Sequence, residues 1–368
     1  MILLVACTPQ ATPAPLSPAP APAAPAKAPV PASDLTSPTS QDAAWNKIVE
    51  AAKKEGIVNV YTWGWTGDTG VTITKVFENR HGIKLNIITG RGAEFIERIK
   101  TETRMGNVTA DMFEGAAQHS ENMRLEGLLT QAGDLPVLRN KVDFSVDPFL
   151  FSPEGYYLVE NQFYSALYIN TNLVKPGEEP KAWVDLLEPK WKGKIIFSDP
   201  VVSVSPSYFA VLIEQKRLGL DFLEKLGKQD MMFDPSTPGV ASKIARGEAW
   251  VGFTDTNSVA PLALEGAPIK IIDTREGVFA NGLAVGPVKN GPHPNATRLF
   301  LNWILSQEGQ DVYTKVKGVL TVRKDVPDYQ PQAVRLKPQN PVFLGSEYNN
   351  LLAKTFRDKQ FVPLLKPK

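Results

Sequence analysis

Apolar runs and amphipathic stretches alternate along the chain from about residue 44 onward. In residues 44–55, Trp45, Ile48 and Ala52 recur at the spacing of one helix face, which predicts an amphipathic helix ending at Gly56. Short apolar runs typical of buried strands follow, and each leads through a loop into another helical stretch. These predicted strands lie at 57–63, 83–88 and 110–114. Strand, loop and helix repeated in this way predict an α/β sheet with parallel strands.

The loops after these strands are candidate ligand-binding segments. Sheets of this type bind ligands beyond the carboxyl ends of their strands, so loops 63–67, 90–92 and 114–116 should share one rim. The first two loops are rich in glycine and precede helices, whose free N–H groups favour anions. Turn geometry alone explains the glycines of any single loop. The meeting of three such loops on one rim is what indicates a site.

The second half of the chain continues the pattern with less regular spacing. Strands are predicted at 156–158, 163–169, 195–197, 249–253, 269–272, 283–288 and 318–323. Helices are predicted at 207–218, 219–228, 236–246, 294–309 and 347–356. With 368 residues, of which 43% are hydrophobic and 21% charged, the chain is long enough for two domains of ordinary size.

Charge and residue usage narrow the partners and sites. The formal net charge is +1, so nothing global points to nucleic acid, and no nucleic-acid partner is predicted. No apolar run approaches the roughly 18 residues of a membrane-spanning helix. A single cysteine cannot form an intramolecular disulfide, and one cysteine with three histidines argues against a conventional zinc site. No cofactor is predicted.

The N-terminal 40 residues differ in composition from the rest. Leu4-Val5-Ala6-Cys7 matches a lipobox, in which the cysteine is lipidated and becomes the mature N-terminus; the alternative is a chance cysteine in a disordered tail. Only Met1 to Ala6 precede the cysteine, less than the charged and apolar regions of such a signal need, so we expect the true start to lie upstream. Residues 8–40 are nearly all Pro, Ala, Ser and Thr, which predicts an extended tether behind a membrane anchor.

A motif in the middle of the chain carries a resemblance to a known family. Residues 185–187 (Asp-Leu-Leu) and 189–195 (Pro-Lys-Trp-Lys-Gly-Lys-Ile) resemble the segment that opens the second lobe of bacterial extracellular solute-binding proteins. Within that group the resemblance is strongest to the branch labelled ferric-iron binding. Residues 77–83 and 110–111 are similar to the family's first lobe, and 168–173 to its crossover between lobes.

The resemblance implies a type II periplasmic-binding-protein fold. This is an α/β fold of two lobes, each a mixed sheet flanked by helices, joined by two crossover strands and closing around a ligand. The predicted division is a truncated lipoprotein signal and tether at 1–40, lobe 1 at 41–166 and 286–330, lobe 2 at 167–285, and a tail at 331–368 that packs on the lobes. The implied partners are a small-molecule ligand, an ABC permease with its ATPase and, through the lipid, the membrane. We expect a monomer.

In the ferric-binding branch, adjacent tyrosines in the region after strand 249–253 ligate the metal. Here Asp255, Thr256 and Asn257 stand in that region, which argues against direct iron coordination because a hard trivalent ion prefers anionic oxygen ligands. Alternative metal ligands, drawn in part from elsewhere in the chain, are Tyr61, Tyr164 and Asp255.

Other candidates suit a polar, anionic organic ligand. Arg91, between two glycines, is suited to clamp a carboxylate or phosphate, although an exposed surface arginine explains it as well. Serines alternate before a predicted helix, where hydroxyls either cap the helix or bind an anion. One of the tryptophans flanking Gly64 would form an aromatic wall. The predicted ligand-binding residues are Trp63, Trp65, Thr66, Gly67, Arg91, Gly92, Glu114, Gly115, Asn161, Ser203, Ser205, Ser207, Asp255, Thr256 and Asn257, with lipidation at Cys7.

These features predict an extracytoplasmic, lipid-anchored solute-binding protein that delivers a small anionic organic ligand to an ABC importer. The alternative ligand is ferric iron. Alternatives of another class are a membrane-anchored sensor subunit and a hydrolase. No enzymatic activity is predicted, because no histidine stands in an acid–base or triad pattern and loop 90–92 lacks the spacing of a nucleotide-binding motif.

Overall fold

The computed structural model of the chain describes residues 40–140, 143–145, 152, 154–201, 205–343 and 355–365. The chain divides into Met1–Thr39 and a second unit, Ser40–Lys368, which holds every described element. Cys7 and the predicted tether lie outside the described residues. Among the residues that are described, no helix is both long and apolar enough to cross a membrane.

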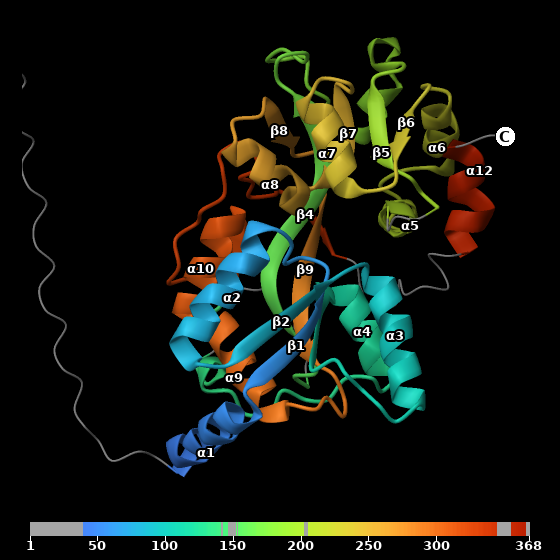
Figure 1. The fold of residues 1–368 in the computed structure, drawn as a ribbon. Helices are drawn as coiled ribbons and strands as arrows, with labels where there is room; N and C mark the ends of the chain where they lie inside the picture. The colour runs from blue at the N-terminus through green and yellow to red at the C-terminus, as the bar shows by residue number, and fades with distance from the viewer. Residues whose placement is uncertain are drawn as a thin grey trace, which may run out of the picture. The chain divides into compact units, whose positions relative to one another are not determined.

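The strands of Ser40–Lys368 form one continuous mixed sheet in the order β2-β1-β3-β9-β4-β7-β5-β6 (Figure 1). In lobe 1, β1 lies parallel to both β2 and β3; in lobe 2, β5 lies parallel to both β6 and β7. Between the lobes run β4 and β9, antiparallel to each other and to their outer neighbours. These two are the crossover strands, so the predicted fold class is confirmed. The main strands are β1 (Ile57–Thr62), β2 (Lys84–Thr89), β3 (Met112–Ala116), β4 (Leu158–Asn170), β5 (Ile195–Ser198), β6 (Met232–Asp234), β7 (Val251–Asp255) and β9 (Val278–Pro287).

Helices cover both faces of the sheet in each lobe. In lobe 1, α2 and α10 lie together on one side of the sheet, and α3 and α4 lie together on the other (Figure 1). Lobe 1 holds α1 (Ser40–Glu55), α2 (Asp68–His81), α3 (Gly92–Arg104), α4 (Ala117–Leu125), α9 (Pro294–Ile304) and α10 (Gln307–Lys317). Lobe 2 holds α5 (Ser205–Glu214), α6 (Leu220–Gly227), α7 (Thr237–Ala245), α8 (Thr256–Leu264) and the short strand β8 (Ile269–Ile272).

The crossover strand β4 corrects one prediction. The sequence predicted two short strands at 156–158 and 163–169, because the polar residues Glu160, Asn161 and Gln162 interrupt the apolar run. The structure has one strand of 13 residues. Tertiary partners bind these polar side chains: Trp65 Nε1 donates to Glu160 Oε1 at 2.9 Å, and Asn161 Nδ2 donates to the carbonyl of Leu320 at 3.0 Å. A strand can therefore carry polar residues through a buried layer without ending.

The motif that resembles the family's second-lobe opening is scaffold. It forms two short 3₁₀ helices, η4 (Trp183–Leu187) and η5 (Pro189–Trp191), before β5 begins. Trp183 and Trp191 are both 1% exposed. The Trp183 ring lies edge-on to Phe209 and Phe253, with centroids 4.9 and 5.3 Å away. Aromatic packing of this kind fixes the start of lobe 2.

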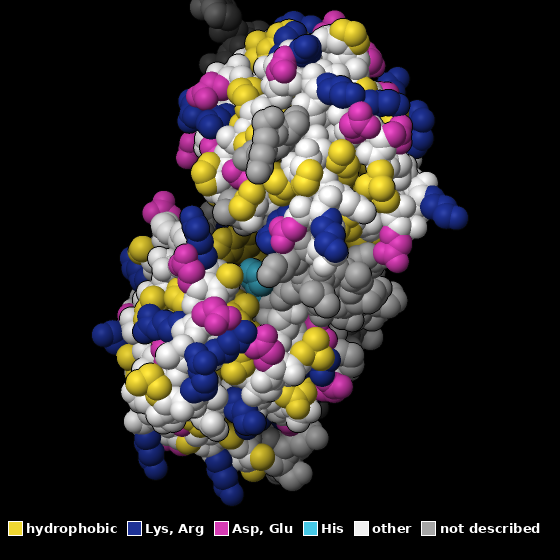
Figure 2. Space-filling model, turned by 90° about the vertical axis from the view of Figure 1, so that its right-hand side faces the viewer, with side chains coloured by type: hydrophobic (Ala, Val, Ile, Leu, Met, Phe, Trp, Pro, Cys, Tyr) yellow, Lys and Arg dark blue, Asp and Glu magenta, His cyan; other side chains and the backbone are white. Residues whose placement is uncertain are grey.

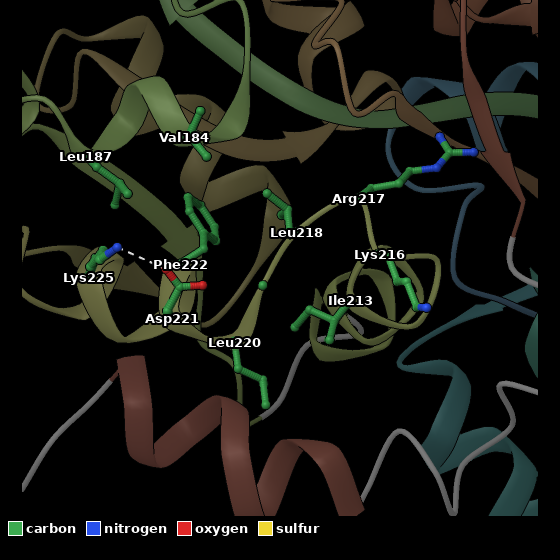
Figure 3. Close-up of a pocket in the computed structure, with 11 residues that line it drawn as sticks. Val184, Leu187, Ile213, Lys216, Arg217, Leu218, Leu220, Asp221, Phe222 and Lys225 are labelled. Atoms are coloured by element: carbon green, nitrogen blue, oxygen red, sulfur yellow. Dashed lines mark hydrogen bonds and ion pairs between the residues drawn. The ribbon is translucent and has the colours of Figure 1, made fainter.

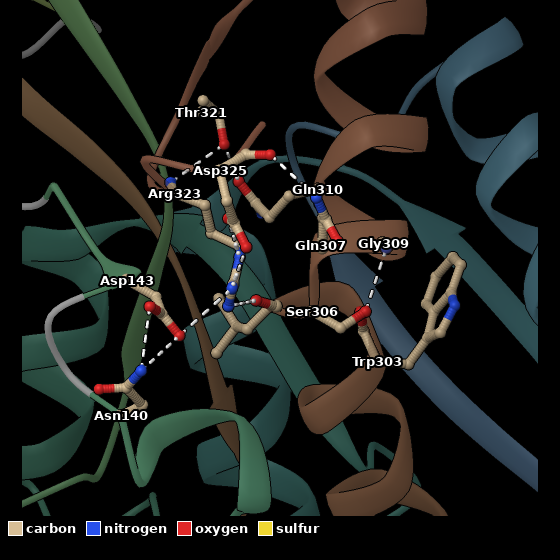
Figure 4. A network of polar contacts seen from close by, with 11 residues as sticks. Asn140, Asp143, Trp303, Ser306, Gln307, Gly309, Gln310, Thr321, Arg323 and Asp325 are labelled. Carbon is tan, nitrogen blue, oxygen red and sulfur yellow. Dashed lines mark hydrogen bonds and ion pairs between the residues drawn. The ribbon is translucent and has the colours of Figure 1, made fainter. Parts of the chain in front are cut away.

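The closing helices differ from the single predicted helix at 294–309. Ser306 separates α9 from α10 and caps α10, because its Oγ accepts from the N–H of Gly309 at 3.2 Å. The Gln310 side chain then connects α10 to two strands of the sheet. Its Oε1 accepts from Thr321 Oγ1 at 3.0 Å in β10 (Leu320–Thr321) (Figure 4). Its Nε2 donates to the carbonyl of Glu160 at 3.0 Å.

The described part of the C-terminal tail packs on lobe 2. Its strand β11 (Pro341–Phe343) adds in parallel to β9. Beyond it, the helical segments η7 (Arg357–Phe361) and α12 (Val362–Leu365) contact α5 and α6. The helix predicted at 347–356 lies almost wholly outside the described residues.

Candidate functional site

The carboxyl ends of the parallel strands in both lobes point toward one stretch of the crossover strands. β3 ends at Ala116, which pairs with Leu283 of β9, and β7 ends at Asp255, which pairs with Ser165 of β4. Ser165 also pairs with Phe279, four residues before Leu283. At 3.3 Å per residue the two rims are about 13 Å apart along the strands. This spacing suits a small molecule, and Figure 2 shows the surface hollowed between the two lobes.

A ring of three hydrogen bonds lies in the floor of this cleft. Ser165 Oγ donates to Tyr208 Oη at 3.3 Å, Tyr208 Oη donates to Asn281 Oδ1 at 3.2 Å, and Asn281 Nδ2 donates to Ser165 Oγ at 3.2 Å. All three side chains are buried, and burial raises the pKa of Tyr208 well above its usual value. Because the three residues belong to β4, α5 and β9, the ring fixes α5 to both crossover strands.

The two tryptophans of the first lobe-1 loop have opposite environments. Trp63 is 37% exposed, whereas Trp65 is 1% exposed. Trp65 lies edge-on to Phe300, with centroids 5.5 Å apart. Only Trp63 is therefore placed to form an aromatic wall. Thr66 and Gly67 are exposed in the same loop, and Gly67, at φ 56°, is the N-cap of α2.

Glu114 lies buried beneath this loop and occupies its amides. Glu114 Oε2 accepts from the N–H groups of Trp63 and Gly64, at 3.0 and 2.7 Å, and from Thr62 Oγ1. A carboxylate of the chain therefore already holds the Trp63 and Gly64 N–H groups, which leaves the helix starts as the predicted anion-binding positions on this rim. Gly115 follows within β3, where it is buried and pairs with Ala284.

The first turns of α3 and α4 meet at the same rim. Neither N-cap residue, Arg91 for α3 and Ala116 for α4, makes a side-chain cap among the described residues. The first turn of α3 contains the exposed Glu94, whereas that of α4 has no acidic residue. The His119 ring of α4 lies against Gly92 of α3, so closely that a Cβ at Gly92 would be 2.4 Å from His119 Nδ1. Burial lowers the pKa of His119, which is therefore neutral at pH 7. Arg91 is exposed beside this pair.

The facing helices of lobe 2 are capped by their own side chains. Asp255 is the N-cap of α8, and its Oδ1 accepts from the N–H of Ser258 at 2.9 Å. Ser236 caps α7 in the same way, accepting from the N–H of Gly239 at 3.1 Å. Asp255 is buried, and burial raises the pKa of its carboxyl. The structure thus gives Asp255 a structural partner before any ligand is considered.

The other predicted lobe-2 residues are distributed around this cap. Thr256 is buried and its hydroxyl bonds both the N–H and the carbonyl of Tyr164, at 3.1 and 3.0 Å. Asn257 Nδ2 donates to Asn161 Oδ1 at 3.1 Å, which connects α8 to β4. In the first turn of α5, Ser205 is buried and Ser207 is half-buried; Ser203 lies outside the described residues.

The three alternative metal ligands do not come together. The Tyr61 hydroxyl donates to Glu102 Oε1 at 2.7 Å, away from the rim. Tyr61 pairs with Phe113, which pairs with Gly286, whereas Tyr164 pairs with Ala280, six residues along β9 and thus about 20 Å away. Within the described residues, no group of three or more His, Cys, Asp or Glu side chains is arranged to hold a metal ion.

A separate pocket of about 580 Å³ lies on lobe 2 (Figure 3). It is lined by η4, the end of α5 and the start of α6. Lys225 within it is paired with Asp221 at 2.9 Å, and Arg217 Nη1 donates to the carbonyl of Glu276 at 2.8 Å. The strand ends described above do not line it.

Several residues of the cleft and its support were absent from the sequence prediction. They are Ser165, Tyr208, Asn281, His119, Glu160 and Lys317. A polar residue inside an otherwise apolar strand was the available signal for Ser165, Glu160 and Asn281, because buried polar groups need partners. Lys317, which ends α10, has the sequence signature of an ordinary basic helix end.

Comparisons with known proteins agree with this geometry. A relative from Salmonella typhimurium, named "Putative 2-aminoethylphosphonate-binding periplasmic protein", is 25% identical over 292 residues. The match covers 74% of this chain and 80% of the relative. Iron-bound HitA from Pseudomonas aeruginosa superposes with a TM-score of 0.68 at 20% identity, covering 82% of this chain and 98% of its own. AfuA from Actinobacillus pleuropneumoniae with fructose-6-phosphate bound gives a TM-score of 0.68 at 21% identity, covering 85% and 99%.

These structural likenesses confirm the fold. The sequence profile of one protein family, described as bacterial extracellular solute-binding protein, matches residues 72–341. The match runs from α2 through both lobes to β11. This chain therefore belongs to the bacterial extracellular solute-binding proteins.

Proposed function

We propose that this protein captures a small, polar, anionic organic molecule between its lobes and delivers it to an ABC permease and its ATPase. The ligand contacts both lobes and stabilises the closed form, and no chemical conversion is part of the function. The site comprises the exposed residues of loop 63–67, Arg91 and Gly92 on lobe 1, and α5 with Asp255 to Asn257 on lobe 2.

The observation that carries this proposal is the contrast between the two rims. α3 and α4 begin without side-chain caps among the described residues, whereas α7 and α8 are capped by Ser236 and Asp255. Uncapped first turns present N–H groups and the positive end of the helix dipole, which favour an anion. Arg91 adds a full positive charge beside them. The anionic group of the ligand therefore belongs on lobe 1, at the start of α3 and α4.

The comparisons support an anionic organic ligand. Aminoethylphosphonate and fructose-6-phosphate, named for the Salmonella relative and for AfuA, both carry a phosphorus oxyanion on a short organic body. Ferric iron is the alternative that HitA supports. We rank it second because Tyr61 lies about 20 Å from Tyr164 along the sheet, the Tyr61 hydroxyl is bound to Glu102, and Asp255 caps α8. Ferric loading that produced a visible absorption band would reverse this ranking.

A thermal-shift panel tests the proposal. A ligand at 100 times its dissociation constant adds about 2.7 kcal/mol, which raises the Tm of a folded unit of about 330 residues by about 4 °C. We expect such shifts with some carboxylates, phosphonates or sugar phosphates, and none with the matching uncharged alcohols and sugars. A panel of anions that left the Tm unmoved would contradict the proposal.

We further propose that Cys7 carries the lipid anchor and that residues 8–40 hold the protein, as a monomer, away from the membrane surface. The lipobox sequence and the Pro/Ala-rich composition support this. Lipid labelling of the protein in its bacterial host, lost in Cys7→Ser, is the expected result. A permease gene beside this one indicates import, whereas a kinase gene would indicate a sensor.

A further inference from the structure

A cluster of buried charged and polar groups lies beneath loop 62–65, outside the cleft itself. Glu114 comes from β3, Glu160 from β4, and Tyr313 and Lys317 from α10; all are buried. Lys317 Nζ donates to the carbonyl of Gly64 at 2.8 Å. Burying two carboxyls and an ammonium group is costly unless they are paired, so the cluster requires a physical account.

The Glu114 carboxylate occupies the backbone N–H groups just after β1, where an external anion would otherwise bind. Its Oε2 accepts from Trp63 N, Gly64 N and Thr62 Oγ1, and Thr62 Oγ1 in turn accepts from the N–H of Trp65 at 3.0 Å. Gly64 leaves no room for a side chain, because its Cβ would lie 2.5 Å from Glu114 Oε1. One carboxylate thus fixes four consecutive residues of the loop.

Glu160 is placed to meet Glu114. The register of β4 against β9 shifts between Val159 and Asn161, which leaves Glu160 as the extra residue of a bulge. Gln310 Nε2 donates a hydrogen bond to the backbone carbonyl of Glu160, and Trp65 Nε1 donates one to Glu160 Oε1. Among the described residues of this cluster, Glu160 Oε2, Glu114 Oε1 and the Tyr313 hydroxyl are buried without a hydrogen-bond partner. If one of the two interacting carboxyls carries a proton, these two carboxyl oxygens can share it in a hydrogen bond, and neither is then left without a partner.

The charges agree with this arrangement. Burial, followed by the charge of Glu114, raises the pKa of Glu160 well above its usual value, which favours the protonated form of its carboxyl. One proton on two carboxyls leaves one negative charge, which the ammonium group of Lys317 balances. Burial lowers the pKa of Lys317, against the attraction of Glu114, Glu160 and, from lobe 2, Asp255. The Tyr313 hydroxyl stays neutral because burial raises its pKa.

We propose that Glu114 and Glu160 share one proton and that their remaining negative charge, paired with Lys317, positions the loop presenting Trp63. Resting on the proposed function, this inference also orients the ligand. Glu114 already occupies the N–H groups at the end of β1, so the anionic group of the ligand is directed to α3 and α4. The uncharged part of the ligand then lies against Trp63.

Chemical rescue in the ligand-free protein tests the role of Glu114. Glu114→Ala removes the side-chain acceptor of the Gly64 amide, so we expect hydrogen exchange at Gly64 to accelerate about 10- to 100-fold. The Trp63 amide also donates to the backbone carbonyl of Glu114 at 3.2 Å, which the substitution keeps, so its exchange should change less. Acetate, which resembles the missing side-chain end, should restore protection and raise the Tm of this variant. The matched control is Glu126→Ala, in which acetate should do neither, because Glu126 forms an exposed ion pair with Lys100. Unchanged exchange in Glu114→Ala would overturn the proposal.

Infrared spectroscopy tests the shared proton. At neutral pH the wild-type protein should show the C=O stretching band of a protonated carboxyl, and Glu160→Gln should lack it. Glu160→Gln should keep the Gly64 amide protected, because an amide N–H replaces the shared proton, whereas Glu160→Leu should expose it. A band that persists in Glu160→Gln refutes the assignment. None of these measurements uses a ligand, so they decide the matter even if every anion in the panel fails to bind.

Discussion

Asp255 offers a sharp test because the sequence and the structure assign it different roles. From its position after a strand, the sequence predicted a ligand contact whose removal leaves the empty protein unchanged in stability. In the structure Asp255 is 4% exposed and caps α8, with Ser258 donating from both its N–H and its Oγ, at 2.9 and 3.1 Å. Loss of an N-cap costs about 0.5–2 kcal/mol, and loss of a buried hydrogen bond about 1 kcal/mol more. We expect Asp255→Ala to destabilise the empty protein by about 2–3 kcal/mol, or about 3–4 °C in Tm.

Asp255→Asn separates the cap from the charge. Burial raises the pKa of Asp255, so the folded protein keeps a proton that the unfolded chain has already released. Stability therefore falls as the pH rises from the unfolded pKa to the folded pKa, and it stays lower above that window. Asparagine keeps an acceptor for Ser258 and cannot ionise. We expect Asp255→Asn to match or exceed the wild type in Tm at pH 7, with the difference disappearing below about pH 4.

Thermal or urea unfolding of the empty protein measures both variants across this pH range. The reasoning is refuted if Asp255→Ala leaves the Tm unchanged, because a residue that caps α8 cannot be removed without cost. It is also refuted if Asp255→Asn is as damaging at pH 7 as Asp255→Ala, because the charge would then be stabilising despite its burial.

Three further predictions concern lobe 1. Trp63→Ala should weaken ligand binding without lowering the Tm of the empty protein, whereas Trp65→Ala should cost about 3–5 kcal/mol in unfolding experiments because it empties a core position. Arg91→Ala should raise the Kd for an anionic ligand at least about tenfold in calorimetric titration. The control Arg104→Ala, at the other end of α3, should leave this Kd unchanged. Equal effects of the two substitutions would show that Arg91 acts only through net charge. Gly92→Ala should destabilise by about 1–3 kcal/mol through its clash with the His119 ring, and the double variant with His119→Ala should recover most of this loss.

The fold could be predicted from the sequence because its strands and helices follow simple periodicities. The runs that became β1, β2 and β5 are apolar and bounded by glycine or proline, so their positions were predicted to within a few residues. Longer elements were predicted less well. β4 and β9 are longer than the predicted strands and contain Glu160 and Asn281, polar residues whose partners only the folded protein provides.

The site was harder to predict for a related reason. The sequence locates loops at a rim, but it does not show which N–H groups the chain itself has already occupied. Trp63 and Gly64 have amides that look open in the sequence and are bound by Glu114, 50 residues later. Asp255 looks like a free carboxylate and is a helix cap. Distinguishing an open donor from a satisfied one requires the tertiary hydrogen bonds, which give Asp255 a structural role that its sequence position did not indicate.

This distinction also bears on the ligand. In the ferric-binding branch, tyrosine phenolate oxygens at the end of the corresponding second-lobe strand are available to bind the metal. Here the same position carries Asp255, Thr256 and Asn257. The first two side chains are committed to Ser258 and to the backbone of Tyr164. A hard cation would have to break these contacts to be held, at the cost of the α8 cap. An anion placed on the uncapped starts of α3 and α4 requires no contact to break, so the arrangement of hydrogen bonds favours the anionic organic ligand over iron.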